Sequence, residues 1–160
     1  RVSVKSAVKK RPSAYWGLIG LLVFLCISAA PAGLALVLDA SGASLGMTTE
    51  GLAGSFLPDY LIPGLFLLCV LGLWSLVVAY GLWQLPDWGG LQRVFGWGGR
   101  HWSWGAALLQ GMILVAWIVI QVLIVGYASW LQPFYFGIGM LMVGLCLTAS
   151  VRGYAAIRPQ

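Results

Sequence analysis

Four long runs of apolar residues leave this chain few ways to fold. They cover residues 14–38, 60–83, 103–126 and 133–150, and none of them contains Lys, Arg, Asp or Glu. As an α-helix, even the shortest run would reach roughly 27 Å, close to the hydrocarbon thickness of a bilayer. Membrane-spanning strands would need segments of about ten residues with alternating polarity, which the sequence lacks. Each run is therefore predicted to be a transmembrane helix.

The composition excludes an ordinary soluble domain. Hydrophobic residues make up 61% of the 160 residues and charged residues only 8%, compared with about 45–50% and 25% in soluble domains. So few charges could not cover the surface of a soluble globule. We predict an all-α, polytopic membrane protein, with a single membrane domain of four transmembrane helices in an antiparallel bundle.

The first run also has features of a secretory signal peptide. Five basic residues precede it, and the small residues SAAPA at 28–32 are typical of a cleavage site. We favour a retained helix, because the apolar sequence resumes after Pro31 as GLALVL. Since the numbering begins at Arg1 and not at a methionine, we also expect some residues upstream.

The basic residues predict how the chain is oriented. They lie before the first run, between the second and third, and after the fourth: Arg1, Lys5, Lys9, Lys10, Arg11, Arg93, Arg100, Arg152 and Arg158. The connections at 39–59 and 127–132 have none. The positive-inside rule therefore predicts that both termini and the inner loop 84–102 face the cytoplasm, and that 39–59 is an outer loop. We expect a multi-pass protein of a bacterial cytoplasmic (inner) membrane.

The formal net charge of +5 raises the question of a nucleic-acid partner. Basic residues that flank membrane spans are better explained by orientation and by anionic lipid headgroups. We therefore expect membrane lipids as partners and no nucleic acid. The expected headgroup contacts in the inner loop are Arg93, Arg100 and His101.

The connections predict how neighbouring helices pack. The short 127–132 connection makes the third and fourth helices antiparallel neighbours, and the outer loop 39–59 is apolar enough to fold back over the helix ends. Tryptophans at the run boundaries, including Trp102 and Trp104, are expected in the headgroup region. The glycines expected to permit close helix crossings are Gly17, Gly20, Gly64, Gly72, Gly137, Gly139 and Gly144.

Two glutamines, Gln110 and Gln121, interrupt the third apolar run. Eleven residues turn an α-helix by three turns plus about 20°, so both amides share one helix face, together with Ser103 and Trp117. An unpaired amide in hydrocarbon costs about 2–7 kcal/mol, so this polar stripe should face other helices. It would form hydrogen bonds between helices, or else line a cavity or a subunit contact in which Trp117 stacks on a guest.

Three acids, Asp39, Glu50 and Asp59, lie in or beside the outer loop. Two carboxylates there could share acid–base chemistry or bind a cation. Local roles are favoured: Asp39 begins a turn, Asp59 caps the second helix, and Glu50 is solvated. With one histidine and no Cys-x-x-Cys pair, we expect no metal site and no cofactor. No charge lies deep within a run, which argues against an ion-coupled carrier.

The segments LDASGASLGM (38–47), SFLPDYLIPGLFLLCVLGLW (55–74) and WIVIQVLIVGYASWLQPFYFGIGMLMVGL (117–145) resemble a group of small bacterial four-helix integral membrane proteins. The likeness spans most of residues 15–150 and rests on turn and packing residues. It implies a fold and a topology and no activity. The aspartate pair of lipoprotein signal peptidases, the paired cysteines of quinone-linked thiol oxidases and the first-span glutamate of small multidrug exporters are all missing.

Three hypotheses for the function remain open. The preferred one is a non-enzymatic accessory or assembly subunit, or a homo-oligomer, so that a protein partner or self-association is expected. The alternative is a carrier or binder of a small apolar or lipidic ligand, held by Gln110, Trp117 and Gln121 under the outer loop. The third is an intramembrane hydrolase that uses Asp39, Glu50 or Asp59.

Overall fold

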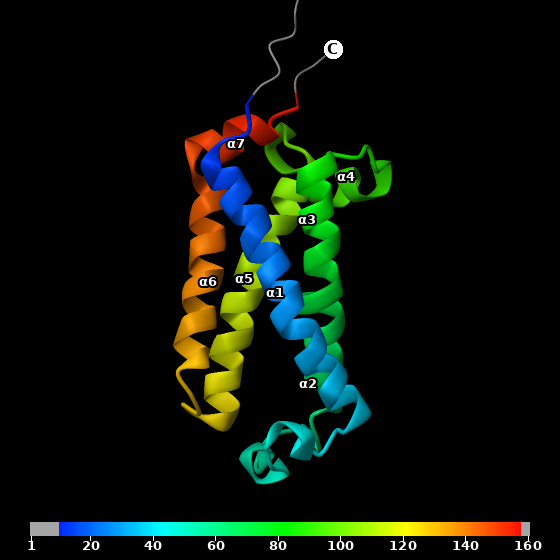
Figure 1. Cartoon of the computed structure of the whole chain (residues 1–160), viewed down its shortest axis with the longest axis vertical. Coiled ribbons are helices and arrows are strands. Elements are labelled where there is room, and N and C mark those ends of the chain that lie inside the picture. The colour runs from blue at the N-terminus through cyan, green and yellow to red at the C-terminus, as the bar shows by residue number, and fades with distance from the viewer. Residues whose placement is uncertain (1–9, 158–160) are drawn as a thin grey trace, which may run out of the picture.

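The computed structural model describes residues 10–157, which form helices and turns without any β-strand (Figure 1). The prediction of an all-helical fold is confirmed. Within these residues, the one β-type contact is an isolated bridge between Arg100 and Ala156. Four of the basic residues used to predict the orientation lie outside the described part of the chain: Arg1, Lys5, Lys9 and Arg158.

Three helices are long and apolar enough to cross a membrane. They are α1 (Ser13–Leu38), the continuous helix Leu61–Gln84 and α5 (Trp102–Val125), each with a mean hydropathy of 2.5. The helix Leu61–Gln84 consists of α2 (Leu61–Phe66), a π-helical segment Leu67–Leu73 and α3 (Trp74–Gln84). The chain therefore has the composition and helix lengths of a multi-pass membrane protein.

A fourth membrane-crossing helix exists only if two bent helices are counted together. α6 (Leu131–Leu147) and α7 (Ala149–Ala155) meet at an angle of 64°. Thr148 between them has an extended backbone (φ −64°, ψ 144°), which ends α6. The predicted run 133–150 thus extends past this bend, because its composition does not change there.

The helices form two pairs. α1 packs along the helix Leu61–Gln84, and α5 packs along α6 (Figure 1). Glycines allow the backbones to approach closely within each pair. A Cβ atom added to Gly33 of α1 would lie 2.7 Å from the carbonyl oxygen of Gly64 in α2, and one added to Gly111 of α5 would lie 3.1 Å from that of Gly139 in α6.

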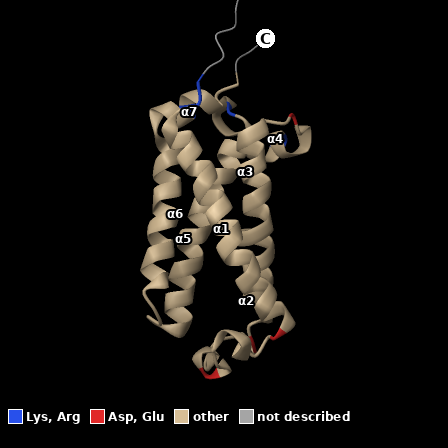
Figure 2. Cartoon of the chain, in the orientation of Figure 1, with Lys and Arg blue, Asp and Glu red and all other residues tan. Residues whose placement is uncertain are grey.

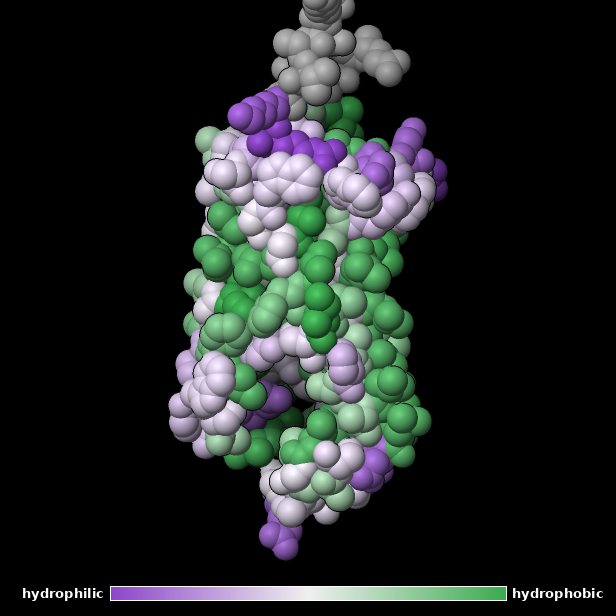
Figure 3. Space-filling model, viewed as in Figure 1, coloured by the Kyte–Doolittle hydropathy of each residue, from purple (hydrophilic) through white to green (hydrophobic). Residues whose placement is uncertain are grey.

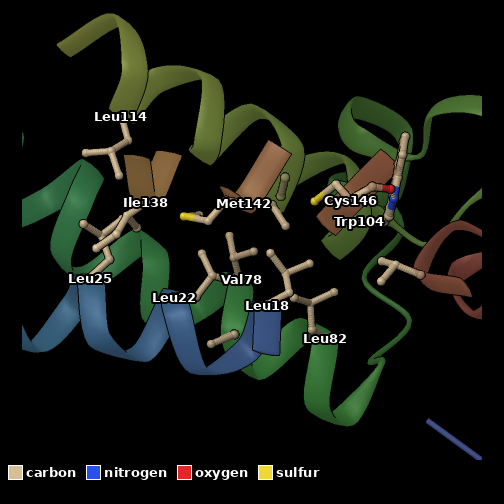
Figure 4. Close-up of a cluster of buried hydrophobic side chains, with 14 of the residues drawn as sticks. Leu18, Leu22, Leu25, Val78, Leu82, Trp104, Leu114, Ile138, Met142 and Cys146 are labelled. Atoms are coloured by element: carbon tan, nitrogen blue, oxygen red, sulfur yellow. Dashed lines mark hydrogen bonds between the residues drawn. The ribbon is translucent and has the colours of Figure 1, made fainter. Parts of the chain in front are cut away.

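The two pairs join around an apolar core. Figure 4 shows Leu18 and Leu22 of α1 pointing toward Val78 of α3, with Met142 of α6 on the opposite side. All four side chains are fully buried. Outward-facing side chains are also apolar, and Leu123 is 78% exposed. Figure 3 shows this apolar surface between two more hydrophilic ends, as expected for a chain surrounded by lipid.

Charged residues lie at the two ends of the molecule (Figure 2). Basic residues and the described ends of the chain lie at the end formed by α4 (Gly89–Phe95) and α7. Asp39, Glu50 and Asp59 lie at the opposite end, in and beside the segment 39–59. The long helices between carry no charged residue.

Candidate functional site

A cavity of about 790 Å³ lies between the two helix pairs, beside the segment 39–59. Figure 3 shows the molecule hollowed at this position. α5 packs against α3 near the end that carries the termini, whereas no extensive contact joins α5 to α2 in the described part of the chain. The pairs therefore diverge toward the segment 39–59. Phe66 of α2 and Trp117 of α5 still meet across the gap, with stacked rings whose centroids are 4.5 Å apart.

The lining of the cavity is apolar at its inner end and more polar near the segment 39–59. Leu25, Leu71 and Leu114 form the floor and are each 1% exposed. The polar residues of the lining are Ser28, Tyr60, Gln121, Ser129, Gln132 and Tyr135, and the lining also includes the indole of Trp117. None of the residues that line the cavity is charged. This is the lining typical of sites for apolar molecules, with a few placed hydrogen-bonding groups.

The segment 39–59 folds back over the helix ends, as predicted. It contains two 3₁₀ turns, Ala43–Leu45 and Thr49–Leu52. Leu52 packs with Leu36 and Tyr60 in a small buried cluster. The Tyr60 hydroxyl donates a hydrogen bond to the carbonyl oxygen of Thr48 at 2.8 Å, which ties the segment to the start of α2.

Asp39 and Asp59 form local hydrogen bonds, and Glu50 is exposed. The Asp39 carboxylate accepts hydrogen bonds from the Ser41 hydroxyl and from the backbone N–H of Ser44, and these bonds lower the pKa of Asp39. Asp59 Oδ1 accepts from the N–H of Leu61 at 3.0 Å. Within residues 10–157, no group of three or more His, Cys, Asp or Glu could hold a metal ion.

The predicted polar stripe on α5 divides into two parts. Ser103 and Gln110 are fully buried between helices and do not line the cavity. Trp117 and Gln121 do line it, beneath the segment 39–59. A cavity is therefore present at the Trp117–Gln121 end of the stripe, and Gln110 does not line it. One face of Trp117 is already covered by Phe66, so the ring is not freely open to a guest.

Gln110 instead completes the hydrogen bonding of the π-helical segment. In an α-helix the N–H of Trp74 would bond to the carbonyl of Val70, but here it bonds to Cys69, five residues back. Gln110 Nε2 donates to the Val70 oxygen at 2.8 Å and to Ser75 Oγ at 2.7 Å. The side chain of Gln110 thus donates a hydrogen bond to the Val70 carbonyl, which does not accept from the Trp74 N–H in the π register.

The orientation of the Gln110 amide follows from its partners. Ser75 donates its hydroxyl hydrogen to the carbonyl of Leu71, so Ser75 Oγ can only accept from Gln110. Both acceptors therefore face the NH₂ group. The opposite atom, Gln110 Oε1, is buried without a hydrogen-bond partner in the described part of the chain.

Gln121 differs from Gln110 in having no partner. It is half-buried, and none of the other described residues forms a hydrogen bond with its amide. Sequence reasoning missed Gln132, which also lines the cavity. Its Oε1 accepts from the N–H of Ala128 and its Nε2 donates to the Gly126 oxygen, closing the turn between α5 and α6. The available signal was a glutamine at the end of the short connection 127–132.

At the opposite end, His101 caps α5. Its Nε2 donates to the Pro86 carbonyl at 2.9 Å, so its Nδ1 is the acceptor for the Ser103 hydroxyl and N–H. This pattern uses the neutral ring. Burial lowers the pKa of His101, although the bond to Pro86 and the charge of Asp87 oppose this shift. Both nitrogens are thus occupied within the protein and are not available to the predicted lipid headgroup.

The other residues predicted to contact lipid headgroups, Arg93 and Arg100, differ from each other. Arg93 is exposed on α4, whereas the Arg100 guanidinium lies 4.8 Å from the ring centre of Trp104. Trp102 and Trp104 were expected at the membrane boundary but are buried. Their indole N–H groups donate to the carbonyls of Pro86 and Cys146, respectively. They are covered because the segment 84–102 and α6 pack over the start of α5.

No protein-family model, curated protein sequence or solved structure matches this chain. The cavity has the stronger claim to be a functional site, because it combines open volume with an unpartnered amide. At the end that carries the termini, His101, Trp102 and Trp104 form their hydrogen bonds within the protein.

Proposed function

We propose that the protein binds a small apolar or lipidic ligand in the cavity between its helix pairs. The observation that carries this proposal is a cavity of about 790 Å³ with an apolar floor, within the 300–1,000 Å³ typical of small-molecule sites. Exposed apolar side chains at its edge, Ile62 and Ile120, would give a ligand a route from the bilayer. In this role the protein is a binder or carrier and performs no reaction.

We also propose that the chain lies in a bacterial cytoplasmic membrane with both termini inside. Four spans would result if α6 and α7 together cross the bilayer, with α7 near the headgroups. The separation of basic residues from Asp39, Glu50 and Asp59 supports this orientation. Arg93 and Arg152, both exposed, are then placed to contact anionic lipid headgroups.

Filling the cavity tests the proposed function. Ala32→Phe should place a ring in the cavity and abolish retention of lipid by the protein purified in mild detergent, because Ala32 is part of the lining. Leu34→Phe is the matched control, since Leu34 lies on the same helix, is 47% exposed and is not in the lining. Native mass spectrometry would measure the bound mass. Absence of bound lipid in the unaltered protein, or equal retention by both variants, would overturn the proposal.

A second candidate function is that of an accessory subunit or homo-oligomer. It is favoured by Gly137 and Gly144 of α6, where an added Cβ would meet no other described atom within 4 Å. Such small residues on an open helix face permit close contact with another helix in a membrane. Gel filtration with light scattering should then show an oligomer or complex that Gly137→Leu dissociates. A monomer without any partner would count against this candidate.

The hydrolase hypothesis gains no comparable support. The carboxylates of Asp39 and Asp59 accept hydrogen bonds from neighbouring backbone groups. Glu50 is exposed and does not line the cavity. None of these contacts supports a shared reaction centre, so we do not propose a reaction at this end.

A further inference from the structure

We infer that the ligand is an uncharged amphiphile, with a single hydrogen-bonding head at Gln121 and an apolar chain that extends toward Leu114. This inference rests on the proposed function and specifies the chemistry of the same cavity. Long-chain alcohols and monoacylglycerols have this chemistry. Charged lipids with the same chain do not.

The depth of the polar groups in the cavity sets the direction of the ligand. Gln121 lies seven residues beyond Leu114 on α5, which corresponds to about 10.5 Å along the helix. The inner end is formed by Leu25, Leu71 and Leu114, which offer only apolar surface. A chain would therefore occupy the inner end, and a polar head would lie near the segment 39–59.

Elimination identifies Gln121 as the group that meets the head. The Ser28 hydroxyl donates to the Leu25 carbonyl, and the Tyr60 hydroxyl donates to Thr48. Both the oxygen and the nitrogen of the Gln132 amide form hydrogen bonds within the turn between α5 and α6. Of the polar lining residues, Gln121, Ser129 and Tyr135 have no side-chain hydrogen bond within residues 10–157, and neither has the Trp117 indole. Ser129 lies in the turn at the rim, and the Trp117 N–H can only donate and belongs to a ring stacked on Phe66. The Tyr135 ring packs against Phe24 and Phe134, which are not part of the lining. Gln121 thus offers a donor and an acceptor to a hydroxyl or ester.

The charges around the cavity exclude an ionised head. No Lys or Arg occurs in the segments 39–59 and 127–132, so a carboxylate or phosphate would have no counter-ion. No acid lines the cavity either, so an ammonium group would be unpaired as well. Burying an unpaired charge costs far more than burying a hydroxyl that can bond to an amide. The cavity therefore favours an uncharged head over both kinds of ion.

Photoreactive lipids can test this inference on the full chain in nanodiscs. The probes are a monoacylglycerol, a fatty acid, an alkylammonium ion and a plain alkane, all with the same diazirine-bearing chain. The monoacylglycerol should label cavity residues, such as Trp117, at least several-fold more than the two charged probes. Gln121→Leu should weaken monoacylglycerol binding by about three- to tenfold, the effect of one hydrogen bond. It should leave alkane binding unchanged.

Val122→Leu is the matched control, because Val122 is the next residue on α5 but is absent from the lining. Equal labelling by charged and uncharged probes, or unchanged monoacylglycerol binding in Gln121→Leu, would overturn the inference while leaving the proposed function in place. Failure of every probe, including the alkane, to label the cavity would overturn the proposed function itself. The comparison among probes uses the unaltered protein and does not depend on how a variant folds.

Discussion

Gly33→Ala should lower the free energy of unfolding by about 3 kcal/mol, the upper end of the usual cost of overpacking. The added methyl group would lie 2.7 Å from the Gly64 oxygen and 2.8 Å from the Cα of Leu68, and it would also overlap the Leu68 nitrogen. These are backbone atoms, which cannot rotate away as the end of a side chain can. α1 and α2 would therefore have to separate. Titration with sodium dodecyl sulfate from mild detergent, followed by circular dichroism, measures the change.

Gly20→Ala is the control for this prediction. Gly20 lies on the same helix, but a Cβ there would meet no described atom within 4 Å. Because alanine favours a helix over glycine by about 1 kcal/mol, Gly20→Ala should be neutral or slightly stabilising. If Gly33→Ala were as stable as the unaltered protein, the close crossing of α1 and α2 would be wrong.

Gln110→Glu should lower the free energy of unfolding by about 3–5 kcal/mol near neutral pH, the cost of leaving a buried charge uncompensated. The change keeps the shape of the side chain but removes both N–H donors. Carboxylate oxygens would then face two acceptors, the Val70 carbonyl and Ser75 Oγ. As the pH falls, the carboxyl group gains a proton and can donate one hydrogen bond again. The destabilisation should therefore shrink in acid, as measured by the same titration at several pH values.

Gln121→Glu provides the comparison, because Gln121 is only half-buried and has no partner to lose among the described residues. Its loss of stability should be clearly smaller than that of Gln110→Glu. Equal losses at the two positions, or a loss at Gln110 that does not change with pH, would contradict the hydrogen-bond scheme proposed for the π-helical segment.

The sequence predicts the three long helices well because composition changes sharply where their apolar runs begin or end. It does not predict the end of α6, because the composition stays the same across the bend at Thr148. The sequence does place Gln110 and Gln121 on one face of α5, since that follows from helix geometry alone. The π register is not predictable in the same way, because LLCVLGL (67–73) is as apolar as the residues around it. The role of Gln110 depends on that register, and so it could not be separated from the role of Gln121 in advance.

The contacts of the glycines could also be predicted only in part from the sequence. Gly64, Gly72 and Gly139 were expected at crossings and make close contacts, whereas Gly20, Gly137 and Gly144 meet no neighbouring atoms within the described chain. Gly33, which packs on Gly64, and Gly111, which packs on Gly139, were not predicted to lie at crossings. Which glycine faces a neighbour depends on how each helix is rotated, and apolar sequence on all sides gives little information about rotation.

The positions of the close contacts imply that the molecule is stiff at one end and compliant at the other. Gly33 and Gly111 fasten the helices within each pair. The tight contact between the pairs involves Gly81 of α3 and the Trp102 ring, near the end that carries the termini. The two helix pairs are therefore joined at the end that carries the termini and are farther apart at the other end. If the pairs moved apart beside the segment 39–59 to admit a ligand, the helix contacts within each pair would stay intact.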